Sequence, residues 1–248
     1  MIRRRTDEGW LLFAQDDHAR LAAQVMKLWG GGGFFFPQSP EDLLFALSEH
    51  DCGWKEPDSR PGLNGAGEPM DFTEVAPQPQ TEIWRRSFGA HCGERPVASA
   101  LIALHFNRFN NRTLSKRPNR WSLSLKDEIG EFVEKTLGVR PCGIAPETTR
   151  LLKLLQIGDA LSLALCHAWG RFEITDAPLA DGGAVDITVL LEEDGGFSVR
   201  PWPFLRREPL NFEICVRQTA GHNFKTTGRL IESINSRPSG SENFCISP

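Results

Sequence analysis

A carboxylate on an apolar helix face is the feature that most constrains how this chain can fold. Residues 147–169 carry apolar side chains at helical spacing, and Asp159 lies on that stripe beside Leu151, Leu155 and Leu163. Burying a charge is costly unless the charge is paired, hydrogen-bonded or bound to a metal. The fold must therefore bring a cation or a hydrogen-bond network to Asp159.

Histidines on other predicted helices are candidates for that partner. His18 lies on the apolar face of a helix predicted over residues 17–29, and His105 lies on the apolar face of a later one. His50 and Asp51 fall at the C-terminal end of a third predicted helix. Imidazole nitrogens and carboxylate oxygens that converge from separate helices suit Zn, Mn, Fe or Co. The sequence therefore predicts a metal site.

The order of these residues carries a resemblance to a known family. His18, the pair His50-Asp51 and Asp159 follow one another as His…His-Asp…Asp, which resembles the HD-domain superfamily of metal-dependent phosphohydrolases. With their flanking residues and His105, the same positions are similar to a bacterial family of unknown function that has an HD-like pattern. The resemblance implies one or two divalent transition metals, Fe, Mn or Zn.

Six side chains form the ligand set that this resemblance implies. One carboxylate would bridge two ions, with three further ligands on the first ion and two histidines on the second. Asp51 would be the bridging carboxylate. The first ion would also bind His18, His50 and Asp159, and the second ion would bind His91 and His105. The long interval before the last aspartate leaves other assignments open. A buried polar network that ties the helices together without metal is the alternative.

A basic segment follows His105. Six basic residues and no acidic residue lie between Arg108 and Lys126. Guanidinium groups bind phosphate oxygens through paired hydrogen bonds, so Arg108 and Arg112 are the preferred candidates for binding an anionic substrate. A solvated basic loop is the alternative, because charge runs are usually on the surface.

Metal and basic segment together predict a reaction class. A bound metal lowers the pKa of water toward neutrality and neutralises phosphoryl oxygens. We expect a metal-dependent hydrolase of a small phosphorylated substrate, with Asp51, His105, Arg108 and Arg112 as catalytic residues. Two alternatives stay open: a di-iron oxygenase-like enzyme that acts on a polyol, and a non-catalytic HD-like binding or structural protein.

The predicted secondary structure changes after Trp169. Residues 171–235 contain β-branched and aromatic segments separated by glycine turns, which predicts a small antiparallel β region. An N-terminal β-hairpin is predicted before residue 15, and residues 236–248 are typical of a disordered tail. The predicted fold class is mostly α, with an HD-like helical bundle over residues 1–170.

Residues 55–81 predict a long loop. The segment contains five prolines and begins soon after Asp51, so it is well placed to act as a lid. An excursion without function is the alternative.

Composition excludes several classes of partner. The net charge of -4 argues against binding to nucleic acid or to an anionic membrane surface. The apolar run from Trp10 to Ala14 is too short for a signal peptide or a membrane span.

The six cysteines show no CxxC spacing, which favours reduced thiols and a cytoplasmic protein. Cys52 has no neighbouring signal for a lowered pKa and is interpreted as a packing residue.

Overall fold

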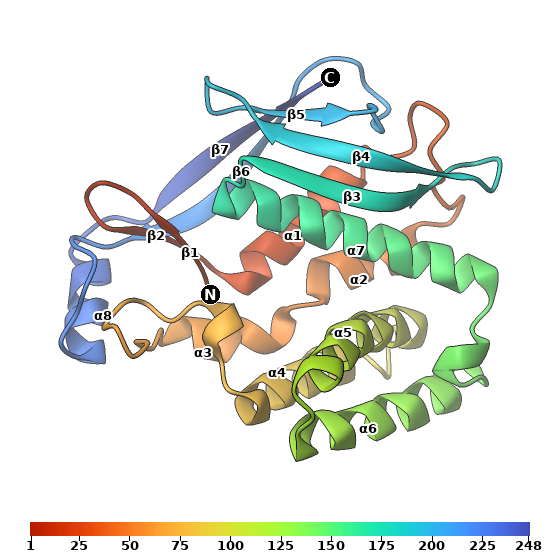
Figure 1. Cartoon of the computed structure of the whole chain (residues 1–248), viewed down its shortest axis with the longest axis horizontal. Helices are drawn as coiled ribbons and strands as arrows, with labels where there is room; N and C mark the ends of the chain where they lie inside the picture. Colours follow the sequence, from red (N-terminus) through yellow and green to blue (C-terminus); the bar gives the residue numbers. More distant parts are fainter.

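A seven-stranded β-sheet covers one side of a helical assembly in the computed structural model, which describes residues 1–248 (Figure 1). The strand order is β1-β2-β6-β7-β5-β4-β3, and all neighbours are antiparallel except β5 and β7. The strands are β1 (Ile2–Arg5), β2 (Trp10–Phe13), β3 (Arg171–Pro178), β4 (Ala184–Leu191), β5 (Phe197–Arg200), β6 (Leu210–Gln218) and β7 (Gly240–Ser247).

Strand β6 shows how the sequence specifies this sheet. Leu210, Phe212, Ile214 and Val216 are buried, and the residues between them are exposed. Successive side chains of a strand point to opposite faces, so this alternation buries one face of the strand only. The buried face joins the core that the sheet shares with the helices.

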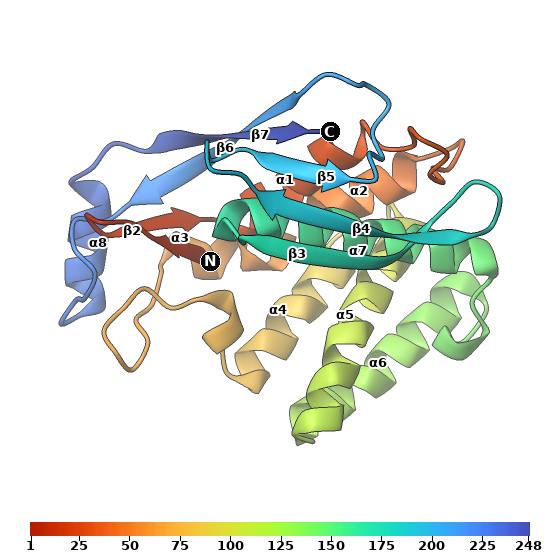
Figure 2. The same ribbon diagram turned by 45° about the horizontal axis from the view of Figure 1, so that its top comes forward.

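The helices form two tiers beneath the sheet. Figures 1 and 2 show α1 and α7 directly against the sheet and α4, α5 and α6 on the far side of them. The α-helices are α1 (Gln15–Met26), α2 (Glu41–Glu49), α3 (Lys55–Ser59), α4 (Pro77–Gly89), α5 (Pro96–Lys116), α6 (Arg120–Leu137), α7 (Pro146–His167) and α8 (Thr227–Asn235). Three short 3-10 helices are η1 (Cys52–Trp54), η2 (Phe72–Glu74) and η3 (Pro141–Gly143).

Helix α7 lies at the centre of the molecule. Pro146 opens it at the first helical position and Ala168 ends it in the left-handed conformation, with φ 52°. It contacts β3 on one side and α1, α2 and α5 on the other. Because both sides are covered, its apolar residues extend around much of the helix. A single hydrophobic cluster of 42 buried residues therefore runs through both the helices and the sheet.

No helix combines the length and apolar character needed to cross a membrane.

The predicted fold class, a mostly α HD-like bundle with a small β region, is wrong. The chain has a mixed α/β fold in which strands from three separate parts of the sequence join one large sheet. The N-terminal hairpin, which was predicted, pairs with β6 through Leu11↔Gln218 and Leu12↔Arg217. These pairings join residues about two hundred positions apart, so local sequence patterns do not reveal them.

Two segments have more structure than their composition indicated. Residues 236–248, for which a disordered tail was predicted, contain β7, which pairs with β6 from Leu210↔Ile246 to Val216↔Gly240. Residues 55–81, for which a loop was predicted, contain α3, η2 and the start of α4. The Phe72 N–H donates to the Met1 carbonyl, and the Phe224 N–H donates to Gly67. These backbone bonds hold the segment against the hairpin and the C-terminal region.

Gly158 sets how closely α7 approaches α1 and α2. A Cβ atom added there would lie 2.5 Å from Leu47 Cδ2 and 2.7 Å from Met26 Cγ. Gly130 in α6 is the opposite case, because an added Cβ atom would meet nothing within 4 Å. Substitution of the two glycines therefore distinguishes the effect of close packing on stability from the effect of helix propensity.

We expect Gly158→Ala to lower the free energy of unfolding by about 1–3 kcal/mol, the usual cost of overpacking a core. Gly130→Ala is the matched control and should raise it by up to about 1 kcal/mol, because alanine is the better helix former. Urea denaturation measures both. A stabilised Gly158→Ala protein would contradict the close packing of α7 on α1 and α2.

Candidate metal centre

Five predicted ligands meet in the core where four helices converge. His18 comes from α1, His50 and Asp51 from the end of α2, His105 from α5 and Asp159 from α7. The three histidines are each 1% exposed, and the two aspartates are 6–7% exposed. We call these five residues the His/Asp cluster. Asp159 therefore has the partners that its position on an apolar stripe demanded.

The ligand atoms of the cluster face one another. His18 Nε2 lies 3.2 Å from Asp51 Oδ2 and 3.6 Å from Asp159 Oδ1. His50 Nε2 lies 3.5 Å from Asp159 Oδ1, and His105 Nε2 lies 3.6 Å from Asp159 Oδ2. They form two overlapping groups that share His50, and the ligand atoms within each group lie within 4.8 Å of one another. Each group is a possible metal-binding group.

Hydrogen bonds at the outer nitrogens orient two of the imidazoles. His50 Nδ1 donates to the Leu47 carbonyl at 2.8 Å, which turns Nε2 toward the cluster. Ser162 Oγ donates to the Asp159 carbonyl and accepts from His18 Nδ1 at 2.8 Å, which orients the His18 ring with Nε2 toward the two aspartates. Metal-binding histidines are commonly oriented in this way. His50 Nε2 is buried without a hydrogen-bond partner, so the cluster holds a free ligand atom.

The electrostatics of the cluster favour a cation. Burial lowers the pKa of His50, but Asp51 and Asp159 outweigh it and raise that pKa to about 9. Burial lowers the pKa of His105 to about 4, so this imidazole is neutral at pH 7. For Asp159, burial is outweighed by His50, whose Nε2 lies 3.5 Å away, and by the other histidines, so the pKa of this carboxyl falls to about 2. The two buried carboxylates thus keep a proton on His50, and a metal cation could replace the positive charge of that proton.

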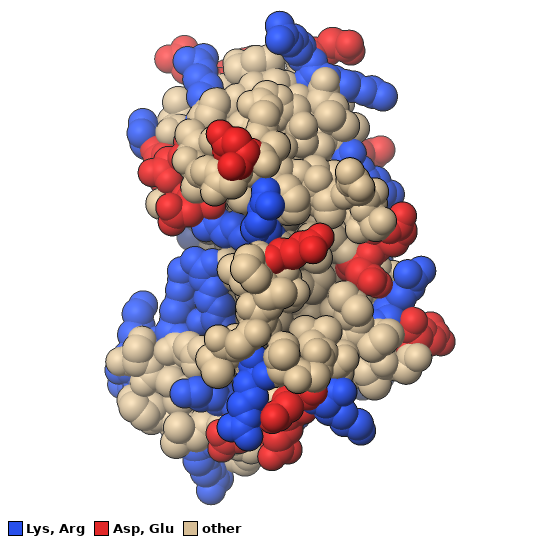
Figure 3. Space-filling model, turned by 90° about the vertical axis from the view of Figure 1, so that its right-hand side faces the viewer, with Lys and Arg blue, Asp and Glu red and all other residues tan.

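A hollow of about 300 Å³ opens beside the cluster, between α5, α7 and β3. Asp159 belongs to its wall, which makes the hollow a route to the buried ligands. Arg108, Arg112 and Lys153 line it together with Phe109, Trp169 and Phe172. Figure 3 shows Lys and Arg side chains gathered around a hollow between the upper part of the molecule, which carries the sheet, and the lower helical part.

The three cations of this hollow have no carboxylate partner. None of them forms an ion pair, whereas Arg85, Arg95 and Arg140 elsewhere on the helices do. Burial and Arg112 lower the pKa of Arg108, and burial and Arg108 lower the pKa of Lys153. Arg108 and Lys153 are partly buried and Arg112 is exposed, and neighbouring cations without an ion-pair partner are typical of an anion-binding site.

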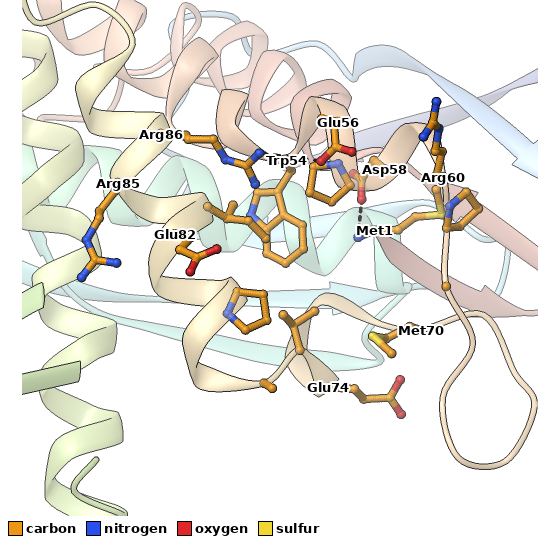
Figure 4. Close-up of a pocket in the computed structure, with 17 residues that line it drawn as sticks. Met1, Trp54, Glu56, Asp58, Arg60, Met70, Glu74, Glu82, Arg85 and Arg86 are labelled. Atoms are coloured by element: carbon orange, nitrogen blue, oxygen red, sulfur yellow. Dashed lines mark ion pairs between the residues drawn. The ribbon is translucent and has the colours of Figure 1, made fainter. Parts of the chain in front are cut away.

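The largest hollow lies elsewhere and has a different character. It measures about 900 Å³, is lined by Trp54, α3, α4 and the segment before α4, and contains no histidine (Figure 4). Its charges are largely paired: the Met1 amino group lies 2.7 Å from Asp58, and Arg85 and Arg86 pair with glutamates. Chemistry that needs the His/Asp cluster therefore belongs to the smaller hollow.

His91 is the one predicted ligand that the structure does not bring to the cluster. It groups with Glu49 and Cys52 instead, and its Nε2 lies 3.4 Å from Glu49 Oε2.

Two residues at the site, Lys153 and Ser162, were not predicted from the sequence. Lys153 lies on the face of α7 that carries Gln156 and Ala160, next to Asp159. This helical spacing could have predicted that Lys153 lies close to the aspartate. Nothing in the sequence singled out Ser162.

Comparison with known proteins identifies a family and no activity. The family model that matches the chain covers residues 1–219 and is described as "Protein of unknown function (DUF3891)". No curated protein and no solved structure matches. The expected resemblance to the HD-domain superfamily is wrong, because the family is a different one and the seven-stranded sheet does not fit an all-helical fold. The hydrolase class that the resemblance implied has no support from the match.

We expect the free energy of unfolding of chelator-treated protein to fall as the pH rises from 6.5 to 9. The pKa of His50 is about 9 in the folded state and about 6.5 in the unfolded chain. The stabilisation is therefore complete below pH 6.5 and is lost as the pH approaches 9. Urea denaturation at a series of pH values measures it.

His50→Gln should flatten this alkaline decline, and His222→Gln, which lies outside the cluster, should keep it. Saturating Zn²⁺ should also remove the decline, because the metal replaces the proton. An unchanged decline in His50→Gln would contradict the charge assigned to this imidazole.

Proposed function

We propose, for a chain that belongs to the DUF3891 family, that the His/Asp cluster binds one or two divalent transition metals and that the protein cleaves a small phosphate ester with water. One observation carries the proposal. Asp159 is a member of the cluster and also part of the wall of a hollow whose three cations have no carboxylate partner. A metal centre and an anion-binding surface thus share one cavity.

The ligand set supports Fe, Mn or Zn. Three imidazoles and two carboxylates are nitrogen and oxygen donors of intermediate hardness, whereas Ca²⁺ and Mg²⁺ prefer oxygen donors alone. The free Nε2 of His50 and the hydrogen bonds that orient His18 and His50 fit such an ion. When bound, a metal of this kind supplies a nucleophilic water at neutral pH and offsets phosphoryl charge.

The residues of the hollow would position the substrate. Arg108, Arg112 and Lys153 provide donors for the non-reacting phosphoryl oxygens and direct the phosphorus toward Asp159. Phe109, Trp169 and Phe172 limit the access of bulk water on the other side. His105 is neutral at pH 7, so it serves as a ligand and not as a proton donor.

The charge of the hollow bears on the alternatives. An uncharged polyol, the substrate of the di-iron oxygenase alternative, would leave all three cations without an ion-pair partner. A non-catalytic binding protein would use the same anion site without needing a free ligand atom at the cluster. The identity of the metal and a test of turnover separate these alternatives from the proposed one.

We expect protein purified without a His tag or chelators to contain one to two equivalents of Fe, Mn or Zn by mass spectrometry. His50→Ala and Asp51→Ala should each lose most of it, because His50 is shared by both ligand groups and Asp51 is a carboxylate ligand of one. His167→Ala is the control and should retain the metal. Protein that takes up no metal after incubation with each ion would contradict the centre.

We expect the metal-loaded protein to hydrolyse at least one member of a panel of nucleotides, sugar phosphates and cyclic nucleotides. Arg108→Ala and Lys153→Ala should each lower kcat/KM about 10- to 100-fold, mainly through KM, because each removes a charge-assisted hydrogen bond. Lys116→Ala, an exposed cation on the same helix as Arg108, should leave both constants unchanged. A panel without any turnover would refute the hydrolase, and equal losses in all three variants would refute the anion site.

A further inference from the structure

A second group of metal-ligating side chains lies outside the His/Asp cluster. Glu49, Cys52 and His91 bring a carboxylate oxygen, a thiol sulfur and an imidazole nitrogen within 4.8 Å of one another. We propose that this Glu49–Cys52–His91 group is a separate metal site that binds a thiophilic divalent ion such as Zn²⁺. The proposal is independent of the function proposed above.

The end of α2 places two of the three ligands. Glu49 is the last residue of α2 and Cys52 is the first residue of η1, so they are three positions apart, on either side of the turn at His50 and Asp51. Side chains at this spacing lie on the same face. His50 and Asp51, which fall between them, point to the other side and into the His/Asp cluster.

Close packing of η1 on α4 brings the third ligand. A Cβ atom at Gly53 would lie 2.2 Å from the Ile83 carbonyl, and the Gly53 N–H donates to Ser87 Oγ at 3.0 Å. Helix α4 ends at Gly89, so the turn that follows it carries His91 next to this contact. The position of His91 is therefore fixed by backbone packing and not by a flexible loop alone.

The His91 ring is also oriented. It stands edge-on to Phe45, with ring centroids 5.0 Å apart and an interplanar angle of 89°. Phe45 lies one turn before Glu49 on α2. This contact holds the imidazole against α2 and directs Nε2 at Glu49 Oε2, 3.4 Å away.

The surroundings of Glu49 attract positive charge. Lys55 Nζ lies 3.5 Å from Glu49 Oε2 and 3.2 Å from Asp16 Oδ1. The Lys55 side chain is 55% exposed, so it can move into solvent when another cation binds. Sulfur, nitrogen and oxygen donors together suit Zn²⁺ and Co²⁺ and disfavour Mg²⁺ and Ca²⁺. Three protein ligands leave a fourth position for water.

Co²⁺ absorption tests this site without relying on activity. A thiolate bound to Co²⁺ gives a strong near-ultraviolet charge-transfer band, which the His/Asp cluster cannot give because it has no sulfur ligand. We expect the full chain, titrated with Co²⁺ under reducing conditions, to develop this band until one equivalent is bound at the thiol site. Cys52→Ser should abolish the band, and His91→Asn should weaken binding about 10- to 100-fold, as disturbed ligand shells do.

Cys92→Ser is the matched control. Cys92 is the exposed neighbour of His91 and lies outside the group, so its loss should leave the band intact. The far-ultraviolet circular dichroism and the urea midpoint of Cys52→Ser should match those of the unmodified chain, which shows that this variant is folded. Absence of the band in the unmodified chain, its persistence in Cys52→Ser, or its loss in Cys92→Ser would overturn the proposal. None of these results would bear on metal binding by the His/Asp cluster.

Discussion

The burial of two carboxylates among three imidazoles is the interaction on which the rest of the structure depends. Asp51 and Asp159 lie in the core at the meeting point of four helices, where an unpaired charge would be very costly. The histidines supply donors and a proton, and Leu47 and Ser162 orient two of the rings. Without metal, a protonated His50 offsets part of the negative charge of the two carboxylates. The arrangement of α1, α2, α5 and α7 is therefore also the arrangement that suits a metal.

The sheet contributes to this centre even though it supplies no ligand. It covers the outer side of α7, which lets the helix present apolar residues on one side and Asp159 with Ser162 on the other. Strand β3 then forms a wall of the hollow through residues such as Phe172 and Thr175. An element that follows α7 in sequence thus helps to shape access to the His/Asp cluster, and the side chains of the cluster come from elements that precede or include α7. Helices and sheet have to fold together to complete the cavity.

Much of the local structure could be predicted from the sequence, because it depends on short-range patterns. Helical spacing predicted that His18, His105 and Asp159 point inward, and the β-branched and aromatic segments after Trp169 were predicted to form a β region, where β3 to β6 lie. The parallel pairing of β5 with β7 could not be predicted, since it joins distant strands and follows a tail whose composition is typical of disorder. A fold class inferred from the helices and the ligand order alone therefore underestimated the sheet.

The same distinction between local and distant information explains the candidate sites. His18, His105 and Asp159 were predicted to point inward and are buried, whereas His91 lies outside the His/Asp cluster because its position depends on how α4 packs against η1. In the segment from Glu49 to Cys52, the two middle side chains and the two outer ones point in opposite directions. The inner pair of this run faces the His/Asp cluster, and the outer pair faces His91. A run of four residues therefore links the two groups, so an ion held by the outer pair would restrain the backbone that positions His50 and Asp51.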